Sequence, residues 1–205
     1  MGFYDDVLLP RLCDLGMRSR QLRPYRERAV TAAEGRILEV GIGSGLNLPF
    51  YSPAAREIVG LEPSSRMVAM ARRKANKAGS PVTFVEGSAE AIPLENESVD
   101  TVVTTWTLCS IPRVGMALGE MRRVLRRDGR LLFVEHGLAP DERVRKWQHR
   151  LTPAWRRFNG GCHLDRPIQR LIEEAGFHLE RLETGYTRGP KALSFIYEGA
   201  ARRGS

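Results

Sequence analysis

The 205-residue sequence is poor in cysteine and contains no long apolar run. Its cysteines, Cys13, Cys109 and Cys162, are widely spaced and odd in number. They fit neither a metal site nor a disulfide framework, so we expect no metal and a reducing, cytoplasmic compartment. The longest apolar stretches, RILEVGI and GRLLFVE, are far shorter than the ~20 residues that span a bilayer. The opening MGFYDDVLLP lacks the basic start of a signal peptide, so we expect no secretory leader.

Positive charge is abundant and unevenly distributed. The formal net charge is +8, and arginines and lysines concentrate in residues 18–28 and 143–157. Basic faces bind nucleic acid, anionic lipid or acidic substrates, but they are also common as plain solvated helix faces. We take the solvated face as the simplest interpretation and expect no nucleic-acid partner. Peripheral contact with an anionic membrane stays open, and composition indicates no oligomeric state.

Apolar runs of strand length alternate with amphipathic helical stretches, which is typical of a parallel sheet covered on both faces. One or two helices are expected within residues 4–30, a basic and aromatic segment at 140–163, and an antiparallel pair at the sheet edge formed by 177–186 and 191–199. The remaining expected elements are strands at 36–42, 57–63, 82–87, 99–106 and 129–136, and helices at 64–78, 114–127 and 165–175.

Three glycines at alternate positions, Gly41, Gly43 and Gly45, follow the first expected strand in LEVGIGSG. There the chain has to turn tightly and enter a helix, and glycine permits positive φ and close approach of a ligand. Ligands of such sheets bind at the carboxyl ends of strands, where the strand order reverses. The spacing G-x-G-x-G departs from the dinucleotide fingerprint G-x-G-x-x-G, because Leu46 stands where that motif has its last glycine.

Two carboxylates accompany the glycine loop. Glu62 ends the second strand, 21 positions after Gly41, where an acid accepts hydrogen bonds from ribose hydroxyls. Glu39 lies inside the first strand and favours a ligand that carries a cation, whereas phosphates prefer lysine or arginine, which the loop lacks. S-adenosylmethionine has a ribose, an ammonium and a sulfonium, and no phosphate, so we expect it as the cofactor.

The sequence resembles class I S-adenosylmethionine-dependent methyltransferases over roughly residues 35–136, through LEVGIGSG, GLEPSSRMVAMAR, VEGSAEAIPLENESVDTVVTTWTLCSI and EMRRVLRRDGRLLFVEHG. This implies a Rossmann-like, doubly wound, mostly parallel seven-stranded sheet with an antiparallel C-terminal edge hairpin. It also implies one domain over 1–205: a helical cap (1–30), a cofactor-binding core (31–136), an acceptor-side lid and helix (137–175) and a hairpin (176–205). The cofactor-binding residues expected with this resemblance are Glu39, Gly41, Gly43, Gly45, Asn47, Glu62 on the ribose, Pro63, Met67 on the adenine, Gly87, Ser88, Ala89, Glu90, and Thr105 and Trp106 beside the methionine part.

A closer resemblance, carried by TLCSI, EHG and PAWRRFNGGCHLDRP, is to animal thiol S-methyltransferases and bacterial phospholipid N-methyltransferases. It implies a small-molecule methyl acceptor. His136 follows the fifth strand at the carboxyl edge and is our first candidate base for a thiol, with His163 as the second. We expect Trp147, Trp155 and Phe158 to form an apolar lid, the alternative being the core of an accessory helix pair. We expect Cys109 and Cys162 to be buried, with redox sensitivity as the alternative for Cys162.

Three hypotheses follow from the sequence. The first is methylation of a small thiol, and the second is N-methylation of phosphatidylethanolamine at a membrane surface. The third is a cofactor-binding module without catalysis, or an RNA-associated protein that uses its positive charge. The aromatic and histidine residues on the expected acceptor side favour an enzyme.

Overall fold

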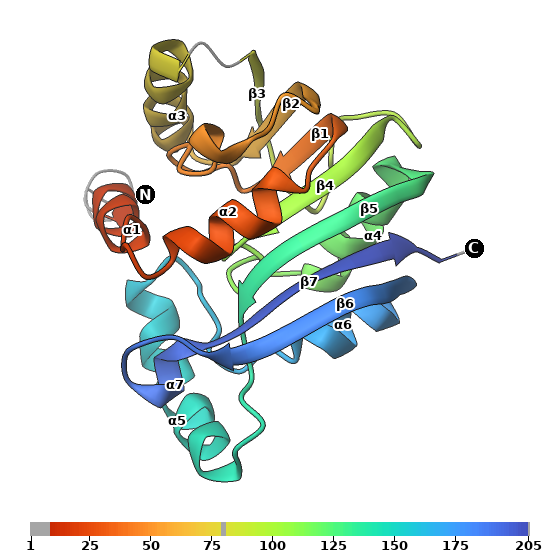
Figure 1. The fold of residues 1–205 in the computed structure, drawn as a ribbon. Coiled ribbons are helices and arrows are strands. Elements are labelled where there is room, and N and C mark those ends of the chain that lie inside the picture. The colour runs from red at the N-terminus through yellow and green to blue at the C-terminus, as the bar shows by residue number, and fades with distance from the viewer. Residues whose placement is uncertain (1–8, 79–80, 205) are drawn as a thin grey trace.

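The computed structural model describes residues 9–78 and 81–204 as a single sheet with helices on both faces (Figure 1). The strands are β1 (Gly35–Val40), β2 (Ala55–Glu62), β3 (Val82–Glu86), β4 (Val99–Thr105), β5 (Leu125–His136), β6 (Phe177–Tyr186) and β7 (Phe195–Arg203). The helices are α1 (Leu9–Met17), α2 (Arg23–Thr31), the 3₁₀ turn η2 (Leu48–Phe50), α3 (Ser65–Ala78), α4 (Val114–Val124), α5 (Glu142–Phe158), α6 (Ile168–Glu174) and α7 (Lys191–Ser194).

The strand order is β3-β2-β1-β4-β5-β7-β6. The first five of these strands are parallel, whereas β7 pairs antiparallel with both β5 and β6. This confirms the expected fold class. The chain runs outward from β1 to β3 and returns to β4 beside β1, so the strand order reverses between β1 and β4, where a ligand site belongs.

Alternate residues of the central strands point to opposite faces and build two cores. Ile37 packs with Val30 of α2 and Ala75 of α3 on one face. Leu38 packs with Met121 of α4 and Ile172 of α6 on the other. Continuous apolar strands therefore arise because both faces of the sheet are buried.

Several expected boundaries shift, each for a local reason. The glycine loop leads into the 3₁₀ turn η2 instead of an α-helix, since Pro49 and Pro53 interrupt the backbone hydrogen bonds that a helix needs. Helix α6 starts at Ile168 instead of 165, because Arg166 precedes Pro167 and is biased away from helical conformation.

Two further boundaries differ from the sequence prediction. Residues 191–194 form the turn of α7 after Pro190 and not a strand, so the last strand runs over 195–203. Helix α4 ends at Val124, because Leu125 is already extended (φ −74°, ψ 131°) and pairs with Val99 at an irregular start of β5. The expected N-terminal helices are α1 and α2, and residues 4–8 of that prediction lie outside the described residues.

No helix in residues 9–78 and 81–204 combines the length and the apolar character needed to cross a bilayer.

Candidate active site

A cavity of about 850 Å³ lies at the carboxyl ends of β1, β2, β4 and β5. Its walls come from segments far apart in the sequence: α1 and α2, the loop after β1, the turn after β4, the segment after α5, and residues 187–196 before and within β7. Most of the predicted site residues line it: Glu39, Gly41, Gly43, Asn47, Glu62, Pro63, Met67, Gly87, Ser88, Ala89, Thr105, Trp106 and His136.

The glycine loop forms one wall of the cavity. Gly41, Gly43 and Gly45 have φ of 69°, 54° and 76°, the left-handed region that favours glycine. A Cβ on Gly41 would lie 2.5 Å from the Thr107 side chain, whereas one on Gly43 would meet no atom closer than 3.8 Å. Gly41 is therefore required by both conformation and space, and Gly43 leaves open room beside the backbone.

Glu62, at the end of β2, is hydrogen-bonded to the glycine loop. Its Oε2 accepts a hydrogen bond from the Gly43 amide at 3.1 Å, and its Oε1 accepts one from the Ser64 amide at 3.1 Å. Burial raises the pKa of Glu62, and these two backbone hydrogen bonds partly counter the rise. Each oxygen keeps a second lone pair, so this carboxylate can still accept hydrogen bonds from a ligand in the cavity.

Glu39 is already paired. Asn47 Nδ2 and the Tyr51 hydroxyl each donate to one oxygen of Glu39 at 2.8 Å, and the residue is 1% exposed. Burial raises the pKa of Glu39 to about 7, and the hydrogen bonds and the charge of Arg26 oppose that rise. Glu39 thereby orients Asn47, whose amide also donates to Thr105 Oγ1 at 3.0 Å.

Arg26 is a site residue that the sequence analysis missed. It belongs to the basic stretch 18–28, yet it is 6% exposed and lines the cavity. Its guanidinium donates to Asn47 Oδ1 at 2.9 Å and lies 4.7 Å from the Trp106 ring centroid. Burial lowers the pKa of Arg26 to about 10, and Glu39 counters part of that shift. Its helical spacing to the buried Ala29 and Val30 is the signal that would have revealed it.

The turn after β4 holds an unusual backbone conformation. Trp106 has φ of 51°, uncommon for a non-glycine residue, and its amide donates to Val134 O at 2.7 Å. Beneath this turn, Glu135 accepts hydrogen bonds from Thr104 Oγ1 at 2.6 Å and from the Thr107 amide at 3.1 Å. A fully buried carboxylate thus fixes the turn that places Trp106 in the cavity wall.

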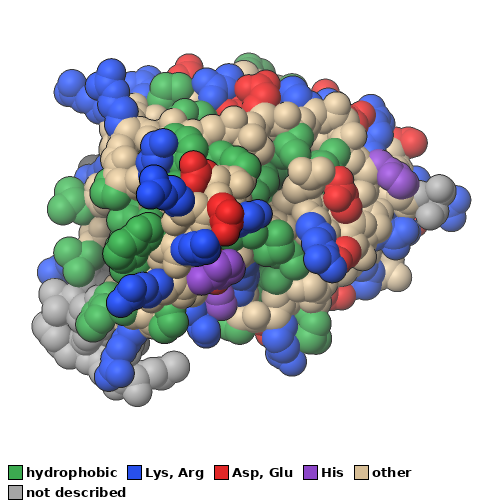
Figure 2. Space-filling model, turned by 90° about the horizontal axis from the view of Figure 1, so that it is seen from below, with side chains coloured by type: hydrophobic (Ala, Val, Ile, Leu, Met, Phe, Trp, Pro, Cys, Tyr) green, Lys and Arg blue, Asp and Glu red, His purple; other side chains and the backbone are tan. Residues whose placement is uncertain are grey.

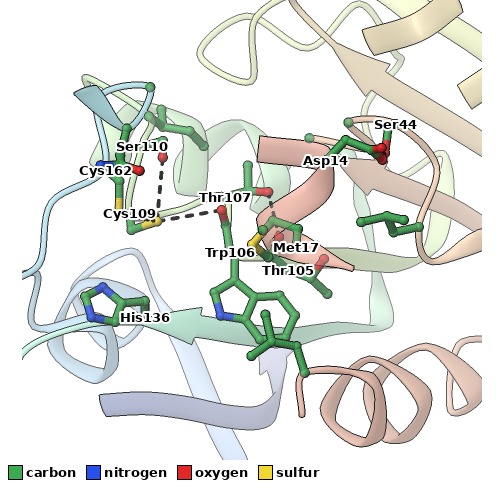
Figure 3. Close-up of a pocket in the computed structure, with 18 of the residues that line it drawn as sticks. Asp14, Met17, Ser44, Thr105, Trp106, Thr107, Cys109, Ser110, His136 and Cys162 are labelled. Carbon is green, nitrogen blue, oxygen red and sulfur yellow. Dashed lines mark hydrogen bonds between the residues drawn. The ribbon is translucent and has the colours of Figure 1, made fainter. Parts of the chain in front are cut away.

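His136 lies at the end of the cavity away from Asp14 and Ser44 (Figure 3). It is 6% exposed, and neither ring nitrogen is hydrogen-bonded to a nitrogen or oxygen of the described residues. Cys109 and Cys162 line the same end, with their sulfur atoms 3.4 Å apart. Trp155 and Phe158 of the expected lid also line the cavity, whereas Trp147 is 57% exposed and lies outside its lining.

Three predicted residues lie outside the cavity lining. Gly45 packs against Leu48 and Ala71, and a Cβ there would lie 2.9 Å from Leu48 Cδ1. Glu90 accepts hydrogen bonds from the Arg113 amide and side chain, each at 2.8 Å. His163 has its Nδ1 3.9 Å from Asp165 Oδ1. Gly45 therefore packs on the side of the loop that faces away from the cavity. His163 does not line the cavity beside His136.

Helix α1 contacts the glycine loop through Asp14. Ser44 Oγ and Lys74 Nζ both donate to Asp14 Oδ1, the latter at 3.0 Å, and Arg18 lies 2.6 Å from Oδ2. Burial raises the pKa of Asp14, but these hydrogen bonds more than offset it, so the net shift is downward. This cluster holds α1 against the cavity.

Comparisons with known proteins agree with this geometry. A family model described as "Methyltransferase domain" matches residues 38–133. Human thiol S-methyltransferase TMT1B is 32% identical over 200 residues, covering 94% of this chain and 80% of that protein. The rat TMT1B is 33% identical over 156 residues, and the match covers 75% of this chain and 64% of that protein. Phosphatidylethanolamine N-methyltransferase of Cereibacter sphaeroides is 37% identical over 117 residues, covering 55% of this chain and 57% of that protein.

Solved structures show the same fold. YcgJ of Bacillus subtilis superposes with a TM-score of 0.69 at 18% identity, covering 90% of this chain and 98% of that one. A SAM-dependent methyltransferase from Aquifex aeolicus gives 0.66 at 17% identity, covering 94% and 97%. The chain therefore belongs to the class I S-adenosylmethionine-dependent methyltransferases, and S-adenosylmethionine is the methyl donor of this family.

Proposed function

We propose that this chain transfers a methyl group from S-adenosylmethionine to a small-molecule thiol bound beside His136. The observation that carries the proposal is the buried imidazole of His136, which lines the cavity beside Cys162 with neither ring nitrogen hydrogen-bonded to a nitrogen or oxygen of the described residues. The thiol S-methyltransferases from rat and human that share 32–33% identity with the chain support the same acceptor class.

The residues around the glycine loop suit S-adenosylmethionine. Glu62 offers free acceptor positions for a ribose diol, next to the open space beside Gly43. Arg26 offers a guanidinium to the carboxylate of the methionine part, while Glu39 lies in the same network and suits its ammonium. A diphosphate would instead meet two carboxylates and one arginine. When bound, S-adenosylmethionine supplies a methyl group activated by a sulfonium.

The chain's own groups would then orient the acceptor and take up its proton. A free thiol has a pKa near 8.5, so its proton is removed at modest cost near neutral pH, and the imidazole of His136 is the group placed to accept it. Trp155 and Phe158 line the same end and would exclude water from the acceptor. Holding the thiolate in line with the methyl group is the largest contribution, because orientation alone can supply about 7–11 kcal/mol of the barrier.

The test is an assay with isotopically labelled S-adenosylmethionine against alkanethiols, amines and phosphatidylethanolamine vesicles, read by product mass. We expect an S-methyl product, and kcat/KM for the thiol about 10²–10⁴-fold lower in His136→Ala. His178→Ala, an exposed histidine on β6, is the matched control and should behave as the wild type. Binding of S-adenosylhomocysteine with no methylated thiol would overturn the proposal.

A second candidate is N-methylation of phosphatidylethanolamine, the substrate named for the bacterial relative. It is favoured by the surface of α5, where Trp147 (57%), Leu151 (38%) and Phe158 (60%) are exposed. Figure 2, which views the molecule from the side of α5, shows apolar side chains mixed with lysine and arginine on this face. Such a surface suits an anionic membrane. An N-methylated lipid in the vesicle arm of the assay, without an S-methyl product, would establish this candidate instead.

A further inference from the structure

Two cysteines separated by 53 positions meet at the acceptor end of the cavity. Cys109 follows β4 and is 2% exposed, while Cys162 follows α5 and is half-buried. Their Sγ atoms lie 3.4 Å apart, and both residues line the cavity. Figure 3 shows them on one wall, with His136 at the same end. Neither thiol has a role in the methyl transfer proposed above.

The backbone already holds the two cysteines together. The His163 amide donates to Cys109 O at 2.8 Å, so the residue next to Cys162 is hydrogen-bonded to Cys109 itself. A Cβ on Gly161 would lie 3.3 Å from Ser110 O, which shows how closely the two segments approach. A disulfide needs an S–S distance of about 2.05 Å, so the sulfurs have to approach by roughly 1.4 Å.

The surroundings favour a thiolate at one of the two sulfurs. The hydrogen bond with Cys109 and the neighbouring His136 lower the pKa of Cys162 against the effect of burial. The same hydrogen bond and burial raise the pKa of Cys109. The buried Arg166 guanidinium lies near both sulfurs and adds positive charge. The pair therefore combines a nucleophile on Cys162 with a protonated partner on Cys109, the arrangement found in reactive dithiols.

We propose that Cys162 and Cys109 form a reactive dithiol that small-molecule disulfides oxidise within the cavity, and that the resulting disulfide stops methyl transfer at the acceptor end. The Cys162 thiolate attacks one sulfur of the disulfide RSSR, a mixed disulfide Cys162–S–SR forms, and RS⁻ leaves. Cys109 then loses its proton to a base, attacks Cys162 Sγ and expels the second RS⁻. The protein dithiol is oxidised to a disulfide, and RSSR is reduced to two RSH.

The size of the cavity and the proposed function together indicate which disulfide acts as the oxidant. Only this identification of the oxidant rests on the proposed function. A cavity of about 850 Å³ admits the disulfide of two small thiols, and an acceptor thiol becomes such a disulfide when it is oxidised. The cross-link would join the segment after α5 to the turn after β4 beside His136. The end near Glu62 would stay unchanged, so cofactor binding should persist.

The probe is 2-hydroxyethyl disulfide, added to the reduced full chain before alkylation, mass measurement and peptide mapping. We expect loss of two hydrogen atoms and one cross-linked peptide pair containing Cys109 and Cys162, both reversed by dithiothreitol. Cys109→Ser should stop at a mixed disulfide on Cys162, and Cys162→Ser should leave Cys109 unreacted. Cys13→Ser, the matched control for the third cysteine, should still form the cross-link. Free, alkylatable Cys109 and Cys162 after treatment, or a cross-link through Cys13, would overturn the proposal.

The functional consequence is measured on the same samples. S-adenosylhomocysteine should bind the oxidised and reduced forms within about twofold, and methyl transfer to whichever acceptor is active should fall at least about tenfold and return with dithiothreitol. Unchanged transfer by the cross-linked protein would refute the block. Absence of thiol methylation in the reduced protein would refute the proposed function alone, because the cross-link and cofactor binding are read without an acceptor.

Discussion

Glu39, Glu62 and Arg26 are three of the charged residues that line the cavity, together with Asp14 and Arg188. The carboxylates of Glu39 and Glu62 were expected from the sequence, and their position at the ends of β1 and β2 follows from the parallel sheet. The glycine loop itself lacks lysine and arginine, but Arg26 reaches the network from α2 and donates to Asn47. A ligand with one carboxylate and one cationic group therefore suits this site better than a ligand with several phosphates.

At Gly41, both the backbone conformation and the lack of space for a side chain require glycine. We expect Gly41→Ala to lower the free energy of unfolding by roughly 1–3 kcal/mol, since alanine would have to adopt φ of 69°. Its Cβ would also push Thr107, 2.5 Å away, and displace the turn that carries Trp106. Binding of S-adenosylhomocysteine should be lost or greatly weakened. Urea unfolding and calorimetric titration measure the two effects.

Gly119→Ala is the matched control for that change. Gly119 is an exposed glycine in α4 whose added Cβ would meet no atom within 4 Å. In a helix, alanine is favoured over glycine by roughly 0.5–1 kcal/mol, so this variant should be slightly more stable than the wild type and bind the ligand normally. Equal stability of the two variants would contradict the conformational argument at Gly41.

At the scale of elements, the sequence predicted the strands better than their connections. Each of the first five strands is an apolar run between turn residues, and such runs are recognisable without knowledge of neighbours. The sequence did not predict the turn η2 or the helix α7. These elements contain only three and four residues, which is too short for a periodic pattern of apolar residues to appear.

Helix α1 illustrates a contact that no local pattern encodes. Its polar residue Asp14 pairs with Ser44 and Lys74, 30 and 60 positions away. We expect Asp14→Ala to release α1 from the glycine loop, since it removes the acceptor of both donors and the partner of Arg18. Amide exchange across Leu9–Met17 should accelerate, and S-adenosylhomocysteine should bind about five- to tenfold more weakly, as measured by exchange mass spectrometry and calorimetry.

The control for this change is Glu27→Ala on the exposed side of α2, which removes a carboxylate of the same charge without touching the glycine loop. Its exchange pattern and affinity should match those of the wild type. Unchanged exchange in Asp14→Ala would mean that α1 is held by its apolar contacts alone.

At the scale of the whole molecule, the antiparallel pairing of β7 with β5 places the start of β7, and the segment before it, at the cavity. Ile196 pairs with His136, and the segment before it supplies cavity-lining residues next to α5. The sequence predicted an edge hairpin, but it contained no sign that Cys109, Cys162 and His136 meet at one end. Those proximities depend on the packing of α5 and β7, which is fixed by contacts between distant segments and not by local spacing.

The buried carboxylate of Glu135 links the fold of the whole molecule to pH. Burial raises the pKa of Glu135 from its ordinary value of 4.5 to about 7, although hydrogen bonds from Thr104 and Thr107 oppose the rise. Between those pH values the folded protein keeps a proton that the unfolded chain releases, so the free energy of unfolding falls as pH rises through this window.

Glu135→Gln cannot titrate and retains an acceptor oxygen. From pH 5 to pH 8 its stability relative to the wild type should rise by about 2–3 kcal/mol, since each pKa unit corresponds to about 1.4 kcal/mol. Urea unfolding at four pH values measures this difference, with the exposed Glu95→Gln as the control that should run parallel to the wild type. A parallel course for Glu135→Gln as well would show that this carboxylate stays ionised in the folded protein across the range.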